Sequence, residues 1–408
     1  MGIKVAQISV ATTGGAGAAA YRLHTALNGN TAIDSYFVRQ LPNPEYAFDK
    51  QVYTVDKKKY SYTDRLKAKL KIDIDTKNNQ RAGIINLCNC EIASFPDTNF
   101  LIEDYPIVKE ADIINLHWVA GFLNYPTFFK KINKPVVWTI HDMNPFSGVF
   151  HYEGDEFINH DIAGRLNQEA LAEKLHSIHK SKKVYVVSPS EWLKKKSEES
   201  KILGIYPHFL IPNSLDFEQY PIMDRLHAKQ THNVDNGHKT LLFIAHDIQI
   251  HRKGFDLLIE ALKNINSNNY NLISVGGQKV VVNDSINHIH YERIHDVREL
   301  NSIYSAADIT ILPSREDNLP NVMLESFANG TPVLSFRVGG MVEHVIPGKT
   351  GLLMPEINSG ELTHYIQEFI ANKFTFESSD IREYALQHFK GDRQAEAYSK
   401  LYNDILNQ

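Results

Sequence analysis

Short apolar runs rich in β-branched residues alternate along this chain with segments of helical periodicity, and this alternation constrains the fold more than any other feature. Strands that alternate with helices form βαβ units and parallel sheets. In the first half, the predicted strands are Ile3–Val10, Ser35–Val38, Ile113–Leu116, Val136–Ile140, Val184–Val187 and Phe209–Ile211. In the second half, they are Leu241–Ala245, Leu272–Val275, Ile289–Tyr291, Ile309–Leu312 and Val333–Phe336. The predicted helices between them include Ala18–Leu27, Phe255–Ile265, Val297–Ala307 and Val322–Ala328.

These strands are too numerous for one doubly wound sheet, so the sequence predicts two α/β domains, residues 1–212 and residues 213–385. The break lies within residues 212–221, where two prolines and the pair Asn213–Ser214 interrupt the pattern. In open parallel sheets, ligands bind beyond the carboxyl ends of the strands. Candidate functional residues are therefore sought directly after each strand.

Composition excludes several classes of protein. The net charge of −5 gives no basic field for nucleic acid. The two cysteines, Cys88 and Cys90, lack the spacing of a zinc site, and no other cluster of metal ligands is evident. The first residues lack the pattern of a signal peptide, and no apolar run approaches the roughly 18 residues that span a bilayer. We therefore expect a cytoplasmic protein.

The first predicted strand is followed by a glycine-rich loop that contains Gly14 and Gly15. Glycines let backbone N–H groups approach an anion, and the following helix offers its positive end. The loop also fits the loose dinucleotide fingerprint, but Asp34 precedes the second strand, and Arg39 stands where an NAD site needs an acid. We favour a phosphate or sugar loop over an NAD site, and a plain tight turn stays an alternative.

Two more predicted strands end in histidine. His117 follows Ile113–Leu116, and His141 and Asp142 close the run that begins at Val136. A single histidine in such a place is more often structural, but two beside a glycine loop favour a polar cleft. Neither has the spacing of a metal-binding pair.

A pair of cations, Arg252 and Lys253, precedes a predicted helix in the second half. Cations at a helix N-terminus oppose the helix dipole by roughly 0.3–1 kcal/mol each, and a bound anion would reverse that sign. A diphosphate suits the pair, because lysine supplies a point charge and arginine a planar fork. A solvated basic turn is the alternative.

The most informative segment is residues 314–325, which follows strand Ile309–Leu312. Glu325 lies among apolar residues, where a carboxylate needs a partner such as ribose hydroxyls or a protein group. Asp317 stands eight positions before it.

With Asn329–Val333 and the glycines of residues 339–351, this spacing resembles the retaining family 4 glycosyltransferases of the GT-B fold. The resemblance covers nearly the whole chain except roughly residues 40–100. It implies two Rossmann-like domains that face each other across a cleft, with the C-terminal helix, residues 386–408, packed back on the first. It also implies transfer of a sugar from a nucleotide-diphosphate sugar to a glycan or lipid-linked acceptor, with retention of configuration and without a cofactor or bound metal.

The resemblance assigns roles to the candidate residues. The catalytic set is His117 and Asp317, with Glu316 as the alternative first carboxylate, and His141 and Asp142 lie on the acceptor side. The donor-binding set is Gly14, Gly15, Arg252, Lys253, Asn318, Leu319, Asn321, Val322 and Glu325. The chain departs from the family at Ile248, where an arginine is usual, and at residues 318–320, where glycines are usual.

These departures keep two other classes open. One is a nucleotide-sugar-binding protein of the same fold with little or no turnover, and the other is an NAD(P)-dependent oxidoreductase built on the first glycine loop.

Residues 57–71 carry seven basic side chains and one acid, Asp64. The aromatic and aliphatic residues among them are Tyr60, Tyr62, Leu66 and Leu70. Such a segment fits either a solvated surface helix or loop, or a shallow, electrostatic contact with an anionic membrane at its inner face.

Overall fold

The structure, a computed structural model, describes residues 2–408 apart from positions 47, 60, 72, 266–268, 280–281 and 283–285. Tyr60 of the basic segment therefore lies outside the described residues. The chain divides into two compact units: Met1–Ile211 with Asp392–Gln408, and Pro212–Gly391. Each unit is a parallel α/β domain, which confirms the predicted fold class. The second unit extends to Gly391 rather than to residue 385, because helix α15 (Ser378–Phe389) packs on helix α12 (Asn321–Ala328) of that unit.

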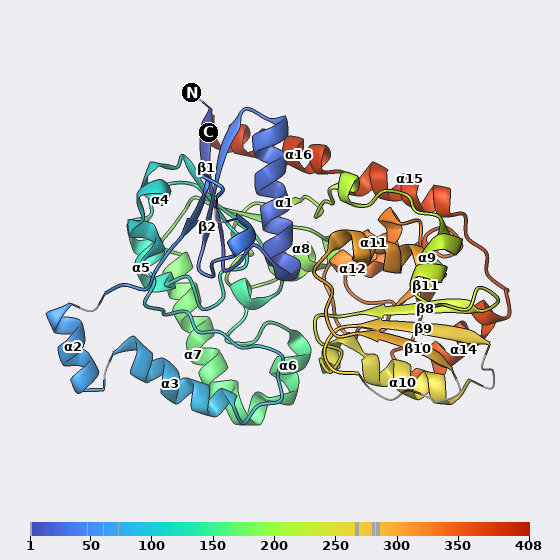
Figure 1. Cartoon of the computed structure of the whole chain (residues 1–408). Coiled ribbons are helices and arrows are strands. Elements are labelled where there is room, and N and C mark those ends of the chain that lie inside the picture. The colour runs from blue at the N-terminus through green and yellow to red at the C-terminus, as the bar shows by residue number, and fades with distance from the viewer. Residues whose placement is uncertain are drawn as a thin grey trace. The chain divides into compact units, whose positions relative to one another are not determined.

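The first unit is built on a seven-stranded parallel sheet in the order β3-β2-β1-β4-β5-β6-β7 (Figure 1). Its strands are β1 (Ile3–Ser9), β2 (Ile33–Arg39), β3 (Val52–Thr54), β4 (Ile113–Leu116), β5 (Val136–Thr139), β6 (Val184–Ser188) and β7 (His208–Leu210). Its helices are α1 (Gly14–Asn30), α2 (Tyr62–Lys69), α3 (Ile74–Ile85), α4 (Pro106–Glu110), α5 (Tyr125–Lys131), α6 (Glu153–Ile158), α7 (His160–Ile178), α8 (Glu191–Glu198) and α16 (Gly391–Leu406).

The second unit is built on a six-stranded parallel sheet in the order β10-β9-β8-β11-β12-β13. Its strands are β8 (Lys239–Ile244), β9 (Tyr270–Val275), β10 (Asn287–Tyr291), β11 (Ile309–Leu312), β12 (Val333–Phe336) and β13 (Gly351–Met354). With α12 and α15, its helices are α9 (Arg225–Thr231), α10 (Phe255–Lys263), α11 (Val297–Ala306), α13 (Met341–His344) and α14 (Ser359–Ile370).

Each sheet reverses its strand order at one place, between β1 and β4 in the first unit and between β8 and β11 in the second. At such a switch point the connections leave the sheet in opposite directions and open a crevice beyond the carboxyl ends of the strands. The glycine loop and His117 follow β1 and β4, and the Arg252–Lys253 pair and Asp317 follow β8 and β11. The topology therefore brings the candidate residues of each unit to its switch point.

Several predicted boundaries differ from the structure. Strands β3 and β13 were not predicted, because the first is only three residues long and the second begins with glycine. Strand β2 begins at Ile33, so Asp34 lies inside the strand rather than before it. Asp34 still stands at the amino end, away from the ligand edge. Helix α1 begins at Gly14, so the glycine loop forms its first turn.

The core of the first unit has two apolar layers, one on each face of the sheet. Alternate residues of β1 divide between them: Ala6 and Ile8 join one layer, and Val5 joins the other. The second layer also contains Tyr398 and Tyr402 of α16, which lies near α1 in Figure 1. Helix α16 follows the second unit in the sequence and completes the core of the first.

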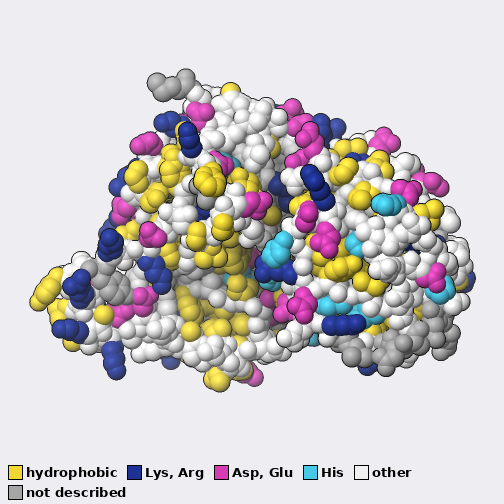
Figure 2. Space-filling view, viewed as in Figure 1, with side chains coloured by type: hydrophobic (Ala, Val, Ile, Leu, Met, Phe, Trp, Pro, Cys, Tyr) yellow, Lys and Arg dark blue, Asp and Glu magenta, His cyan; other side chains and the backbone are white. Residues whose placement is uncertain are grey.

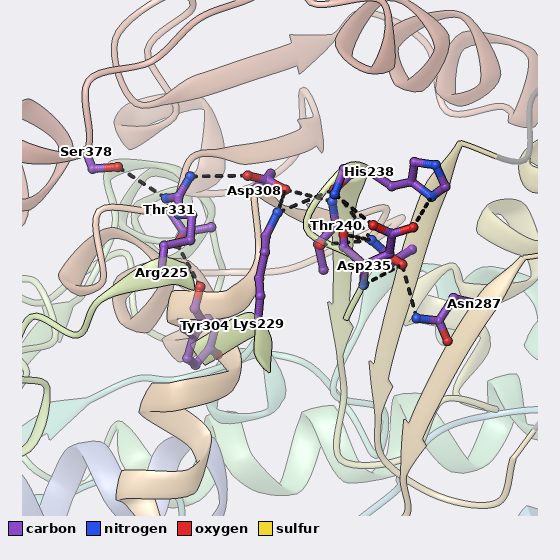
Figure 3. A network of polar contacts seen from close by, with 12 residues as sticks. Arg225, Lys229, Asp235, His238, Thr240, Asn287, Tyr304, Asp308, Thr331 and Ser378 are labelled. Atoms are coloured by element: carbon purple, nitrogen blue, oxygen red, sulfur yellow. Dashed lines mark hydrogen bonds and ion pairs between the residues drawn. The ribbon is translucent and has the colours of Figure 1, made fainter. Parts of the chain in front are cut away.

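The amino ends of β8 and β11 are tied together by an ion cluster around Asp308 (Figure 3). Its carboxylate accepts hydrogen bonds from Lys229 Nζ at 2.7 Å and from the backbone N–H of Thr240 at 2.8 Å. Arg225 Nη1 approaches at 3.3 Å, and Arg225 Nη2 also donates to Ser378 Oγ of α15. The Asp308 cluster thus joins α9 and α15 to the sheet at the edge opposite the switch-point crevice.

Candidate functional site

An ion cluster of three residues lies at the carboxyl edge of the second unit, where β8 and β11 diverge. Lys253 Nζ lies 2.6 Å from Asp317 Oδ2, and Arg252 Nη1 lies 3.5 Å from the same oxygen. The two cations belong to a short 3-10 turn, His251–Lys253, after β8, and the carboxylate belongs to the loop after β11. The structure therefore brings together the diphosphate lysine and the first carboxylate that the resemblance assigned.

Glycines allow the loops of this Asp317 cluster to approach so closely. Gly254 has φ +73°, and a Cβ there would lie 1.8 Å from the carbonyl oxygen of Pro313. Gly339 has φ +54°, and a Cβ there would lie 1.5 Å from the carbonyl oxygen of Asp317. Both positions demand glycine for conformation and for space. The loops are also joined directly, since the Arg315 N–H donates to the Arg252 carbonyl at 2.8 Å.

The electrostatics of the Asp317 cluster favour an anion. Burial raises the pKa of Asp317, but Lys253 and Arg252 outweigh it and hold that pKa below its usual value. The carboxylate is therefore charged at neutral pH, and one negative charge lies between two positive ones. The side chains of the three residues are 10–23% exposed, so solvent screens their charges only partly.

Glu325, the second carboxylate, has a protein partner. Tyr304 of α11 donates its hydroxyl to Glu325 Oε2 at 2.8 Å. Burial and the neighbouring carboxylate raise the pKa of Tyr304 well above its ordinary value, so Tyr304 remains a donor. Glu325 therefore pairs within the protein through at least this hydrogen bond. The bond also fixes the direction of the carboxylate on α12.

The other donor-side candidates join the cluster through the backbone or pack beside it. Glu316 offers its carbonyl oxygen to Arg252 Nη1 at 2.9 Å, and Asn318 donates its N–H to Asp317 Oδ1 at 3.1 Å. The side chains of Leu319 and Val322 pack on the apolar core. Asn321 begins α12, one residue before the predicted start at Val322.

Position 248, where the family has arginine, holds an isoleucine that is 2% exposed and packs in the core of the second unit. Ile248 cannot be the second cation. Arg252 lies beside Asp317 instead, so the cluster keeps two positive charges.

The glycine loop of the first unit is open to solvent. Gly14 has φ +75°, and a Cβ there would meet no atom within 4 Å, whereas a Cβ on Gly17 would lie 2.5 Å from the Ala11 carbonyl oxygen. Gly15 is exposed beside them. At the end of β2, the guanidinium of Arg39 is buried against Thr54 and Asn43. A cation at that position argues against an NAD ribose site.

His117 and His141 form a contacting pair beyond the ends of β4 and β5. His117 Nδ1 lies 3.2 Å from His141 Nε2, and the rings are stacked. His117 Nε2 lies 2.8 Å from Gln7 Oε1, so both nitrogens of this ring, which is 2% exposed, are occupied by protein groups. His141 is the more exposed of the two. Burial lowers the pKa of His141 to about 4 despite Asp142, so the ring is neutral at pH 7.

Asp142 is directed into the protein rather than toward the acceptor side. It is 6% exposed and accepts from Trp118 Nε1 at 2.8 Å, His151 Nδ1 at 2.6 Å and the Asn144 N–H at 3.0 Å. Burial raises its pKa, but these partners hold the pKa below its usual value. Asp142 therefore orders the loop after β5.

The polar residues that support His117 and Asp142 were not predicted from the sequence: Gln7, Asn115 and Tyr402 on the side of His117, and His151 and Lys174 on the side of Asp142. Lys174 of α7 is fully buried and donates to the carbonyls of Asn144 and Gly148. Burial lowers the pKa of Lys174 to about 7. The available signal was a polar residue at an inward strand position, as at Gln7 and Asn115.

Among the described residues, no group of three or more His, Cys, Asp and Glu side chains is arranged to hold a metal ion. Asp73, the first residue of an Asp-Ile-Asp sequence, caps α3 by accepting from the Thr76 N–H at 3.0 Å. Within the residues that the structure describes, no helix is both long and apolar enough to cross a membrane.

Comparison with known proteins finds a family match within the second unit. Residues 238–372 match the family described as Glycosyl transferases group 1. An uncharacterized glycosyltransferase of Methanocaldococcus jannaschii is 34% identical over 127 residues, which cover 30% of this chain and 36% of that protein. A D-inositol 3-phosphate glycosyltransferase of Corynebacterium glutamicum is 36% identical over 113 residues, 26% of each chain. The chain thus matches about a third or less of the length of these relatives.

Solved structures resemble the whole chain. Sucrose-phosphate synthase from Thermosynechococcus elongatus has a TM-score of 0.69 at 17% identity and 99% coverage of both chains. Anabaena HepE, solved in complex with UDP-glucose, has a TM-score of 0.67 at 16% identity, covering 98% of this chain and 100% of HepE. The fold is therefore that of the GT-B glycosyltransferases, and residues 238–372 carry the match to the family of glycosyl transferases group 1.

Proposed function

We propose that this protein is a glycosyltransferase that takes a sugar from a nucleoside-diphosphate sugar bound at the carboxyl edge of the second unit. The observation that carries the proposal is the Asp317 cluster, two cations and one carboxylate at the switch point between β8 and β11. The family match of the same unit and the UDP-glucose complex of HepE support a nucleotide sugar as the donor.

In this proposal, Lys253 and Arg252 bind the diphosphate and stabilise the negative charge that grows on it as the glycosidic bond breaks. Asp317 orients the two cations and lies near the donor sugar. Glu325, directed by Tyr304, accepts from the ribose hydroxyls. The cationic side chains replace a metal ion in this role, so no cofactor is required.

The acceptor is assigned to the first unit, at the crevice between β1 and β4. His141 is the less buried member of the histidine pair there, and the glycine loop follows β1, the strand next to β4. A glycan or a lipid-linked sugar is the proposed acceptor. Retention of configuration is proposed from the resemblance to family 4 alone, and no residue is assigned the role of a covalent nucleophile.

A binding protein of the same fold is the second candidate, since Ile248 replaces the usual arginine in the phosphate site. A screen of nucleotide sugars for hydrolysis without acceptor separates the two. The glycosyltransferase proposal expects slow release of sugar from at least one UDP- or GDP-sugar. Tight binding of the nucleotide without release from any donor in the screen would favour the binding protein.

We further propose that helix α2 rests on the inner face of an anionic membrane. Tyr62, Leu66 and Leu70 recur every four residues and are 84%, 51% and 62% exposed. Lys and Arg side chains surround hydrophobic ones on the part of the first unit that α2 occupies (Figure 2). The single acid of the segment, Asp64, is engaged by the Ser61 capping box and Lys58. The charge of Asp64 is thereby neutralised locally, and the exposed face of α2 stays basic.

Co-sedimentation with vesicles tests this contact. Each basic residue near an anionic surface contributes about 1 kcal/mol, so binding to phosphatidylserine vesicles should be strong at low salt and weak at high salt. Leu66→Ser should reduce binding modestly, and Lys67→Glu with Lys69→Glu should abolish it. Equal sedimentation with neutral and anionic vesicles at low salt would refute the membrane contact.

A further inference from the structure

A row of polar residues crosses a face of the first sheet that is otherwise apolar. Gln7 of β1, Asn115 of β4 and Thr139 of β5 are 0%, 0% and 2% exposed. Their strand neighbours on the same face, such as Val5 and Ile113, pack in the layer that contains α16. Buried polar groups cost free energy unless they are hydrogen-bonded, so this row requires polar partners from the helix above it.

Helix α16 supplies those partners as two tyrosine hydroxyls. Tyr402 Oη accepts from Gln7 Nε2 at 3.2 Å and from Asn115 Nδ2 at 2.9 Å. Tyr398 Oη lies 2.8 Å from Thr139 Oγ1, which donates to Asn115 Oδ1 at 3.0 Å. The polar row is thus bonded from side to side through a helix that is 395 residues from Gln7 in the sequence.

The hydrogen bonds continue from Gln7 to the histidine pair, and each has a defined donor and acceptor. With its Nε2 turned to Tyr402, Gln7 presents Oε1, which carries no proton, to His117 Nε2 at 2.8 Å. His117 therefore donates from Nε2, and its Nδ1 accepts from His141 Nε2, 3.2 Å away. The direction in which the Gln7 amide lies thus sets the tautomer of both rings.

We propose that Tyr402 is a positioning residue: its hydroxyl fixes the Gln7 amide, which holds the His117–His141 pair in one orientation and one tautomer. The inference extends the proposed function, in which His141 meets the acceptor, but the hydrogen-bond chain itself stands without it. It also gives α16 a role beyond packing, since the last helix of the chain orients the acceptor side of the first unit.

The test compares Tyr402→Phe with Tyr206→Phe. Tyr206 is a matched control, because it is a buried tyrosine of the same unit whose hydroxyl donates to the carbonyls of Ile178 and Ser181, away from the histidines. Long-range ¹H–¹⁵N correlation spectra of histidine-labelled protein report which ring nitrogen carries the proton. We expect the Nε2–H form of His117 in the wild type and in Tyr206→Phe, and a mixture of tautomers in Tyr402→Phe.

Kinetics supply a second readout. Loss of one buried hydrogen bond should lower kcat of Tyr402→Phe about threefold to tenfold, with the KM for the donor unchanged because the donor site lies in the other unit. Gln7→Met removes the amide at similar volume and should show the same two effects. His117 tautomers and kcat in Tyr402→Phe that equal those of Tyr206→Phe would overturn the positioning role. Failure of the proposed function is distinct: the wild type would then transfer no sugar while the tautomer difference persisted.

Discussion

The two ends of strand β11 carry ion clusters of the same composition, one aspartate with one lysine and one arginine. At the amino end, Asp308 pairs with Lys229 and Arg225, and beyond the carboxyl end Asp317 pairs with Lys253 and Arg252. The two carboxylates are nearly equally buried, at 12% and 13% exposure. Chemical composition alone therefore does not distinguish a functional cluster from a structural one.

The partners of the two clusters differ. Asp308 also binds the backbone N–H of Thr240, and Arg225 reaches Ser378, so this cluster ties strands and helices together (Figure 3). The Asp317 cluster joins the loops after β8 and β11, which glycines bring together at the switch point. Strand direction therefore distinguishes the structural cluster from the functional one, because ligands of parallel sheets bind at the carboxyl edge.

The sharpest contrast should come from neutralising each aspartate. Asp317→Asn should lower kcat about 100-fold, because Lys253 and Arg252 lose the carboxylate that orients them toward the leaving diphosphate. Asp308→Asn should leave kcat per folded molecule unchanged. Steady-state transfer assays on both variants, with folded protein measured by circular dichroism, give kcat per folded molecule. Equal losses of kcat in the two variants would show that the Asp317 and Asp308 clusters do not differ in function.

The lysines of the two clusters should differ in the opposite direction when stability is measured, because Lys229 should contribute more to it than Lys253. Lys229→Met should lower the free energy of unfolding by about 2–3 kcal/mol, because it leaves Asp308 with one partner fewer at a site where Lys229 is 6% exposed. Lys253→Met should change it by less than about 1 kcal/mol, since Lys253 is 23% exposed. Urea titrations provide both values. A larger loss for Lys253→Met would make the Asp317 cluster structural.

Glu325, the second carboxylate, tests which residues at the carboxyl edge of the second unit bind the donor. Glu325→Gln should weaken donor binding about tenfold, because a charge-assisted bond to the ribose becomes a neutral one. Glu316→Gln is the control for the register of the loop and should be silent. If Glu316→Gln lowers turnover while Asp317→Asn does not, the alignment of this loop is wrong by one residue.

The smallest expected effect is that of a chelator. Activity should be unchanged by EDTA, because the two cations of the Asp317 cluster take the place of a metal ion. Assays with and without added magnesium or manganese after dialysis against EDTA measure this. Activity that is lost on chelation and restored by either ion would contradict the metal-free site.

Much of the fold followed from the alternation of apolar runs and helical segments, because parallel strands buried on both faces leave a strong pattern. Strand β3, Val52–Thr54, lacks that pattern because it is a short, half-buried edge strand. The candidate cations and carboxylates could be predicted because they directly follow strands. The support of His117 by Gln7 and Tyr402 could not, because it depends on the packing of a helix from the far end of the chain. The pairing of Glu325 with Tyr304 likewise depends on how α11 and α12 pack.

The diphosphate site at the carboxyl edge of the second unit is tested most directly by calorimetric titration of UDP and GDP into the wild type, Lys253→Ala and Lys229→Met. We expect the wild type to bind at least one of the two nucleotides. We expect affinity at least about tenfold weaker in Lys253→Ala, since a charge-assisted contact contributes about 1.5–3 kcal/mol, and affinity within about twofold of the wild type in Lys229→Met. Unchanged affinity in Lys253→Ala, or an equal loss in both variants, would contradict a diphosphate site at the carboxyl edge of β8 and β11.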